Sequence, residues 1–134
     1  MKTTRFLVAA AVAVVLGAPC ASAQSPATVT PRGTYALVPD SGYAGPDISS
    51  LMVMFADDNS MTITAPDGSL IVRSKLAFES GVVTLNDQDG SNVCQYAGKY
   101  RIVGEVSSFK LSLVEDGCSD RSAIIVALKF VRQD

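Results

Sequence analysis

Short apolar segments alternate with turn residues along positions 33–134, and most of them repeat with a period of two. In Ser107–Val114, for example, Phe109, Leu111 and Leu113 fall on one face and polar side chains fall on the other. This period is typical of a β-strand with one buried face. Eight segments are predicted to be strands: Gly33–Val38, Leu51–Ala56, Met61–Ala65, Leu70–Phe78, Val82–Asn86, Lys99–Val103, Ser107–Val114 and Ala123–Val131.

Short turn sequences, such as Pro66-Asp67-Gly68 and Ser80-Gly81, join many of these segments. Short connections place consecutive strands side by side and antiparallel. The alternation is disturbed around Arg73–Lys75, which predicts a β-bulge there. No segment after residue 23 has a clear helical period, so the sequence predicts an all-β, eight-stranded antiparallel up-and-down meander barrel. Eight strands enclose an interior that side chains just fill, or that holds one small ligand.

The first 23 residues have the pattern of a signal peptide. Lys2 and Arg5 precede the uncharged apolar run Phe6–Ala18, and Ala21-Ser22-Ala23 is a small-residue cleavage site. The 13-residue run is shorter than the roughly 20 residues that span a bilayer. We therefore predict cleavage after Ala23, a flexible tail over residues 24–32, one domain over residues 33–134, and a periplasmic or secreted protein without a stable membrane anchor.

The predicted mature chain keeps two cysteines, Cys94 and Cys118. An even number in an exported chain indicates one disulfide, with a stabilisation of about 3 kcal/mol on the chain-entropy estimate. In an up-and-down meander, the loops after the fifth and seventh strands lie at the same end of the barrel. These are the two loops that hold the cysteines, so the bridge would join two loops of one rim.

Acidic residues collect at this predicted rim. Arg121 is the one basic residue among them, and eight acids belong to the same loops: Asp40, Asp47, Asp67, Asp87, Asp89, Glu115, Asp116 and Asp120. One interpretation is an acidic mouth that favours cationic ligands. The other is that turns use Asp for local hydrogen bonds, and Asp57/Asp58 and Asp87/Asp89 are interpreted in this way as solvated turn residues.

Composition excludes several kinds of chemistry. The chain has no histidine, so it cannot form a Ser-His-Asp or Cys-His nucleophile, or a His-ligated metal or haem site. The predicted mature chain has nine basic and 13 acidic residues, a formal net charge of −4, and no basic stripe for nucleic acid. We expect no catalytic activity, no cofactor, no metal site and a monomer.

Three motifs resemble the short bacterial lipocalin-like, or calycin-type, barrels. They are Gly33-Thr34-Tyr35, Gly98-Lys99-Tyr100-Arg101, and Leu111-Ser112-Leu113 leading into Asp116-Gly117-Cys118-Ser119-Asp120-Arg121. By this resemblance, Tyr35 takes the place of the aromatic residue in the opening strand. Arg132 takes the place of the basic residue that packs on it. The resemblance implies a lipocalin-like barrel and a structural role for these residues.

The leading functional hypothesis is a non-catalytic binding protein for an unidentified small molecule. Barrel mouths are common ligand sites, and the candidate contacts point inward in the predicted strands: Tyr35, Phe55, Tyr100, Phe109, Leu111 and Val126. Leu37, Val53 and Leu128 are predicted to face the same interior. Tyr43 and Arg121 are the candidate contacts at the rim.

A weaker resemblance is to the single-disulfide barrels that inhibit bacterial alkaline proteases. Those inhibitors insert an N-terminal strand into the protease cleft. The resemblance implies an alternative function, a module that binds a secreted protein through the tail Gln24–Arg32 by strand addition. Tyr43, in the glycine-containing loop Pro39–Ser50, is a second candidate contact for such a partner.

Overall fold

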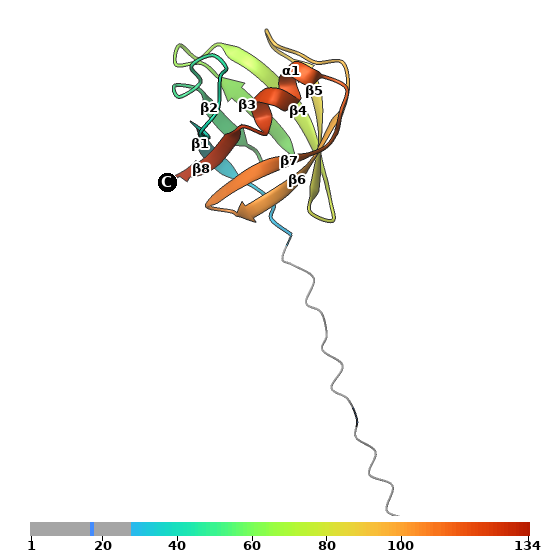
Figure 1. Ribbon diagram of the computed structural model, residues 1–134. Helices are drawn as coiled ribbons and strands as arrows, with labels where there is room; N and C mark the ends of the chain where they lie inside the picture. The colour runs from blue at the N-terminus through green and yellow to red at the C-terminus, as the bar shows by residue number, and fades with distance from the viewer. Residues whose placement is uncertain (1–16, 18–27) are drawn as a thin grey trace, which may run out of the picture.

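The structure is a computed structural model that describes residues 28–134 and the isolated Gly17. Apart from Gly17, the predicted signal peptide and the tail residues 24–27 lie outside the described residues. The described residues form eight strands and one helix (Figure 1): β1 (Gly33–Pro39), β2 (Met52–Phe55), β3 (Ser60–Thr64), β4 (Leu70–Glu79), β5 (Val82–Asp89), β6 (Gly98–Glu105), β7 (Ser108–Asp116), α1 (Ser119–Ile125) and β8 (Leu128–Gln133).

The strands close into a barrel in sequence order, and every neighbouring pair is antiparallel, including β1 with β8. The predicted all-β meander barrel is therefore confirmed. Its eight strands lie close to the predicted segments because alternating burial and short turns are local properties of the chain. The β4–β5 register shifts at the predicted place, between Arg73 and Ser74, but the extra residue lies on β5, because Arg73 pairs with Asp89 and Ser74 with Asp87.

The last predicted strand, Ala123–Val131, is wrong in its first half. Residues Ser119–Ile125 form α1, and β8 begins only at Leu128. The alternation of Ile124, Val126, Leu128 and Phe130 predicts a strand over this whole segment. In the structure Ile124 and Ile125 instead pack onto the barrel core from the helix, which lies at one end of the barrel (Figure 1). Tertiary packing outweighs local propensity here.

One end of the barrel is filled by aromatic side chains. Tyr35, Phe55, Phe109 and Phe130 are each at most 5% exposed, and Phe109 stacks on Phe130 with ring centroids 4.9 Å apart. Tyr35 meets Phe55 and Phe109 edge to face, and its hydroxyl donates to the carbonyl of Val106 at 2.7 Å. This packing closes the end of the barrel opposite α1, because Val106 lies in the β6–β7 turn.

The residues just before β1 belong to the packed body of the protein. Pro31 is fully buried. The guanidinium of Arg32 lies 5.7 Å from the centre of the Phe78 ring and donates to Asn59 Oδ1 at 2.7 Å. The tail predicted to be flexible over residues 24–32 thus contributes its last two residues to the fold.

Candidate functional site

The other half of the barrel contains a cavity of about 560 Å³. This volume lies within the range of about 300–1,000 Å³ typical of small-molecule sites. The wall is mostly aliphatic, and its deeper residues come from the strands: Leu37, Met61, Ile63, Ile71, Val72, Leu85, Leu111 and Leu128. Phe130 of the aromatic end also lines the cavity, at the boundary between the two halves. The loops of the disulfide rim complete it with Pro46, Asp47, Ile48, Asn92 and Val93, and Ile124 and Ile125 of α1 also contribute. The cavity therefore lies directly beneath the rim.

Two segments cover the cavity. In the loop between β1 and β2, Ile48 is 5% exposed and packs into the core, although its neighbours in the loop are exposed. The helix α1 presents Ile124 and Ile125 to the cavity. Both segments thus contribute apolar side chains to the wall of the cavity.

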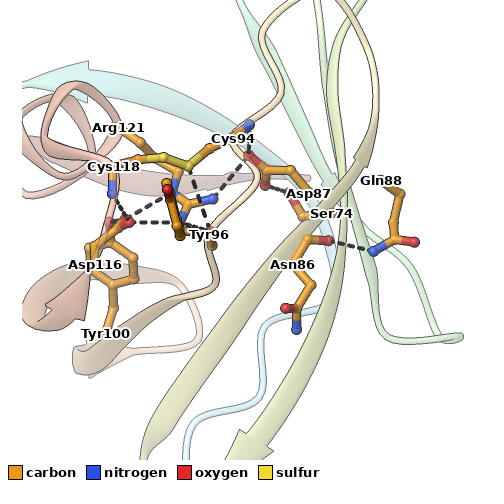
Figure 2. Close-up of polar contacts among 10 residues, drawn as sticks. All are labelled: Ser74, Asn86, Asp87, Gln88, Cys94, Tyr96, Tyr100, Asp116, Cys118 and Arg121. Atoms are coloured by element: carbon orange, nitrogen blue, oxygen red, sulfur yellow. Dashed lines mark hydrogen bonds and ion pairs between the residues drawn. A yellow bond between two sulfur atoms is a disulfide. The ribbon is translucent and has the colours of Figure 1, made fainter.

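The cavity has one polar corner, built from Ser74, Asp87 and Arg121 (Figure 2). The Ser74 hydroxyl donates to Asp87 Oδ1 at 2.6 Å, and Arg121 Nη1 donates to Asp87 Oδ2 at 3.0 Å. The Asp87 side chain is only 3% exposed and that of Arg121 12%. A carboxylate this deeply buried is stable only when it is paired and hydrogen-bonded, as it is here.

Behind this corner, Arg121 also binds Asp116, whose side chain is fully buried. Nε of Arg121 lies 2.8 Å from Asp116 Oδ2, and Nη2 lies 2.7 Å from Oδ1. The Tyr100 hydroxyl donates to the same carboxylate. Gly98 leaves room for this bidentate pair, because a Cβ there would lie 2.6 Å from Asp116 Oδ2 and 2.8 Å from Arg121 Nη2. One arginine therefore joins two buried carboxylates from different strands.

The predicted Cys94–Cys118 disulfide is confirmed, with a Cα–Cα distance of 6.4 Å. It joins the loops that follow β5 and β7, as the strand parity predicts. The two carboxylates hold the same loops through the backbone: Cys94 N–H donates to Asp87 Oδ2 at 3.0 Å, and Cys118 N–H donates to Asp116 Oδ1 at 2.8 Å (Figure 2). The covalent bridge and the Asp87–Arg121–Asp116 cluster therefore stabilise the same rim.

The electrostatics of the cluster follow from these contacts. Burial acts to raise the pKa of the Asp116 carboxyl, but hydrogen bonds from Arg121, Tyr100 and the Cys118 amide outweigh it and hold this pKa below its ordinary 3.8. Burial and the hydrogen bond to Asp116 raise the pKa of Tyr100 above its ordinary 10.0, so its hydroxyl remains a donor. For Arg121, burial favours the neutral form, but Asp116 and Asp87 keep its pKa above the ordinary value.

The lowered pKa of Asp116 predicts a loss of stability in acid. A carboxyl whose pKa is lower in the folded state stabilises the fold above its unfolded value, and this contribution disappears as the pH falls through the folded pKa. We expect the free energy of unfolding, measured by urea titration from about pH 7 to about pH 2, to fall most steeply below the ordinary 3.8. Asp116→Asn should flatten this acid limb. An unchanged acid limb in that variant would contradict the prediction.

The interior residues predicted to contact a ligand divide into two groups. Leu111, with Leu37 and Leu128, lines the cavity. Tyr35, Phe55, Tyr100 and Phe109 are buried but do not line it, as is also true of Val53. Val126 ends α1 and borders a shallow outer depression instead, together with Val103 and Leu113. Apart from Val126, which the helix removes from the strand pattern, the alternation of apolar residues predicted which of these side chains point inward, but not at which height in the barrel they lie.

The residues predicted to lie at the rim have different environments in the structure. Arg121 lines the cavity, whereas Tyr43 packs against the core and donates its hydroxyl to the Pro46 carbonyl at 2.8 Å. The interpretation of Asp87 as a solvated turn residue is wrong, since its side chain is buried and paired. Asp40 forms an ion pair with Lys110. The acidic residues that remain at the cavity wall are Asp47 and Asp120, both exposed.

Sequence reasoning missed Ser74, Asp87 and Asp116 as a cluster. The available signal was local: Ser74 is a small polar residue at an inward position of an apolar strand, within the segment where a bulge was predicted. An inward polar residue needs a buried partner. The sequence does not say which of the rim acids supplies it.

Comparison with protein-family models, curated proteins and solved structures found no match for this chain. Among the described residues, no helix has the length and hydropathy required to cross a membrane. The class that the fold and the cavity define is a small closed antiparallel barrel with one disulfide, compatible with a lipocalin-like architecture. A disulfide is typical of proteins outside the reducing cytoplasm.

Proposed function

We propose that this protein binds a small, mainly apolar molecule in the cavity beneath the disulfide rim, without catalysing a reaction. The observation behind the proposal is the cavity itself: about 560 Å³ bordered mainly by aliphatic side chains, in a barrel whose other end is filled. Apolar cavities that contain a few oriented polar groups are the usual form of a small-molecule site. The lipocalin-like character suggested by the sequence motifs belongs to the same proposal.

The proposal includes export to the periplasm or the medium. The signal pattern of residues 1–23 and the disulfide both support an oxidising compartment. The cavity also has a polar corner, in which Ser74, Asp87 and Arg121 are held in place by hydrogen bonds to one another. Oriented polar groups of this kind are consistent with a binding role. Nothing in this corner resembles an activated nucleophile, because its one hydroxyl, that of Ser74, donates to a carboxylate that is already paired with Arg121.

A blocking substitution tests the cavity as the ligand site. N-phenyl-1-naphthylamine, an uncharged dye that fluoresces in apolar surroundings, is titrated into the mature protein. We expect saturable binding to one site. Ile63→Trp, which places a larger side chain in the cavity wall, should weaken dye binding at least about tenfold, because the added ring occupies ligand volume. Met54→Trp, on the half-exposed outer side of β2, should leave binding unchanged. Equal binding by Ile63→Trp and the wild type would reject this site.

A further inference from the structure

The charges around the cavity point to the chemistry of its ligand. Four charged residues line it, and three of them are acidic: Asp47, Asp87, Asp120 and Arg121. Among the described residues, no lysine lines the cavity. Arg121 is therefore the one basic group in the wall, and the question is whether its charge is available to a ligand.

The contacts of Arg121 answer this question. Its guanidinium donates to Asp116 through Nε and Nη2, to Asp87 through Nη1, and to the Tyr96 carbonyl through Nη2 at 2.5 Å. Four of its five N–H donors are thus used within the protein. Two carboxylates also outweigh its single positive charge, so the buried cluster carries a net charge of −1. An anionic ligand group would meet this excess negative charge in surroundings that screen it poorly.

Asp87 supplies a suitable acceptor on the cavity side. Its Oδ2 accepts from Arg121 and from the Cys94 amide, whereas its Oδ1 accepts from Ser74 alone. A carboxylate oxygen has two acceptor positions, so Oδ1 retains one. Asp87 is 3% exposed and lies at the boundary between the aliphatic wall and the ion cluster. A cation that replaces water at this position would gain a charge-assisted hydrogen bond within a largely apolar site.

The entrance of the cavity also carries negative charge. Asp47 and Asp120 are exposed, belong to the two segments that cover the cavity, and line its outer part. Ser49 donates its amide and hydroxyl to Asp47 Oδ1, and Oδ2 accepts no protein hydrogen bond among the described residues. A cation moving toward Asp87 would therefore pass negative charge at the mouth before it reaches negative charge at the base, which favours its entry.

We propose that the ligand is an amphiphile with an apolar body and a protonated amine, and that the ammonium group binds Asp87 while the body lies against the aliphatic wall. This inference rests on the proposed function and specifies its ligand class. The aliphatic side chains supply most of the contact area. Asp87, with Asp47 and Asp120 at the mouth, selects the charge of the head group.

Three molecules that share one decyl chain separate the head groups. Decylamine, decanol and decanoate compete with N-phenyl-1-naphthylamine at neutral pH for the mature protein. A hydrogen bond to a charged group is stronger than one between neutral groups, so decylamine should displace the dye at a concentration at least about tenfold lower than decanol. Decanoate should be the weakest competitor. If decanol or decanoate competes as well as decylamine, the amine class is wrong and the cavity remains a binding site.

Matched variants assign the effect to Asp87. Asp87→Asn should reduce the advantage of decylamine over decanol by about tenfold and leave decanol binding nearly unchanged. Asp89→Asn is the control, because Asp89 lies on the same strand but forms an exposed pair with Arg73 outside the cavity. Should Asp87→Asn fail to fold, the double variant Asp47→Asn/Asp120→Asn tests the entrance, and it should lower the amine preference without affecting decanol.

Ile63→Trp distinguishes the two proposals from surface binding. Decylamine that still binds this blocked variant as tightly as the wild type would be held by the acidic surface, and the inference would be overturned. If neither the dye nor any decyl compound binds the wild-type protein, the proposed function fails together with the ligand class. A full amine preference in Asp87→Asn would overturn the role of Asp87 while the cavity function stands.

Discussion

Replacing Arg121 with methionine is expected to destabilise the protein by about 3–5 kcal/mol, which is typical when one partner of a buried ion cluster is removed. The loss arises because Asp87 and Asp116, exposed by 3% and 0%, would be left as two buried carboxylates without a counter-charge. Their hydrogen bonds to Ser74, Tyr100 and the cysteine amides would remain. These bonds do not neutralise the charge. Urea unfolding at neutral pH measures the change.

The control is Arg73→Met. Arg73 pairs with Asp89 at 3.5 Å on the surface, where both side chains are at least half exposed, so its loss should cost less than about 1 kcal/mol. A third variant separates charge from packing: Arg121→Met in an Asp87→Asn/Asp116→Asn background should recover part of the lost stability, because no buried charge remains unpaired. A destabilisation by Arg121→Met no larger than that of Arg73→Met would mean that the cluster contributes little.

The Asp87–Arg121–Asp116 cluster could not be predicted from the sequence, although much of the fold could. The strand number and the Cys94–Cys118 bridge follow from local signals, namely alternation, turns and strand parity, and the structure confirms both. Asp87 and Arg121 lie 34 positions apart in segments that each look like polar loops. Their burial depends on how the barrel closes, which no local window contains. Arg121 could be recognised as the one base among rim acids, but its partners could not.

The position of the cavity could not be predicted from the sequence for a related reason. Tyr35 and Leu37 alternate with the same period, and both point inward. Tyr35 belongs to the aromatic end, whereas Leu37 lines the cavity. The difference is the height of each residue along the barrel axis, which is set by the stagger between all the strands together. A sequence pattern predicts the inward face of each strand, but the stagger is a property of the closed barrel.

Replacing Phe109 with alanine is expected to destabilise the protein by about 3–5 kcal/mol, the usual loss for a large aromatic residue in a packed core. Phe109 is 2% exposed, and it stacks on Phe130 while meeting Tyr35 and Phe55 edge to face. Removing its ring would leave a void at the filled end of the barrel and end three aromatic contacts. Val103→Ala, at a position 53% exposed on the neighbouring β6, should change stability by less than about 1 kcal/mol.

This variant also tests whether the two halves of the barrel have separate roles. Phe109 does not line the cavity beneath the disulfide rim, whereas its stacking partner Phe130 does and would remain in the variant. Phe109→Ala should therefore bind N-phenyl-1-naphthylamine with nearly wild-type affinity under conditions where it remains folded, despite its large loss of stability. Ile63→Trp should show the opposite behaviour, with binding lost and the fold retained. If Phe109→Ala abolishes dye binding in the folded protein, the aromatic end forms part of the ligand site, as the sequence pattern predicts for Phe109, and a purely structural role for this end is wrong.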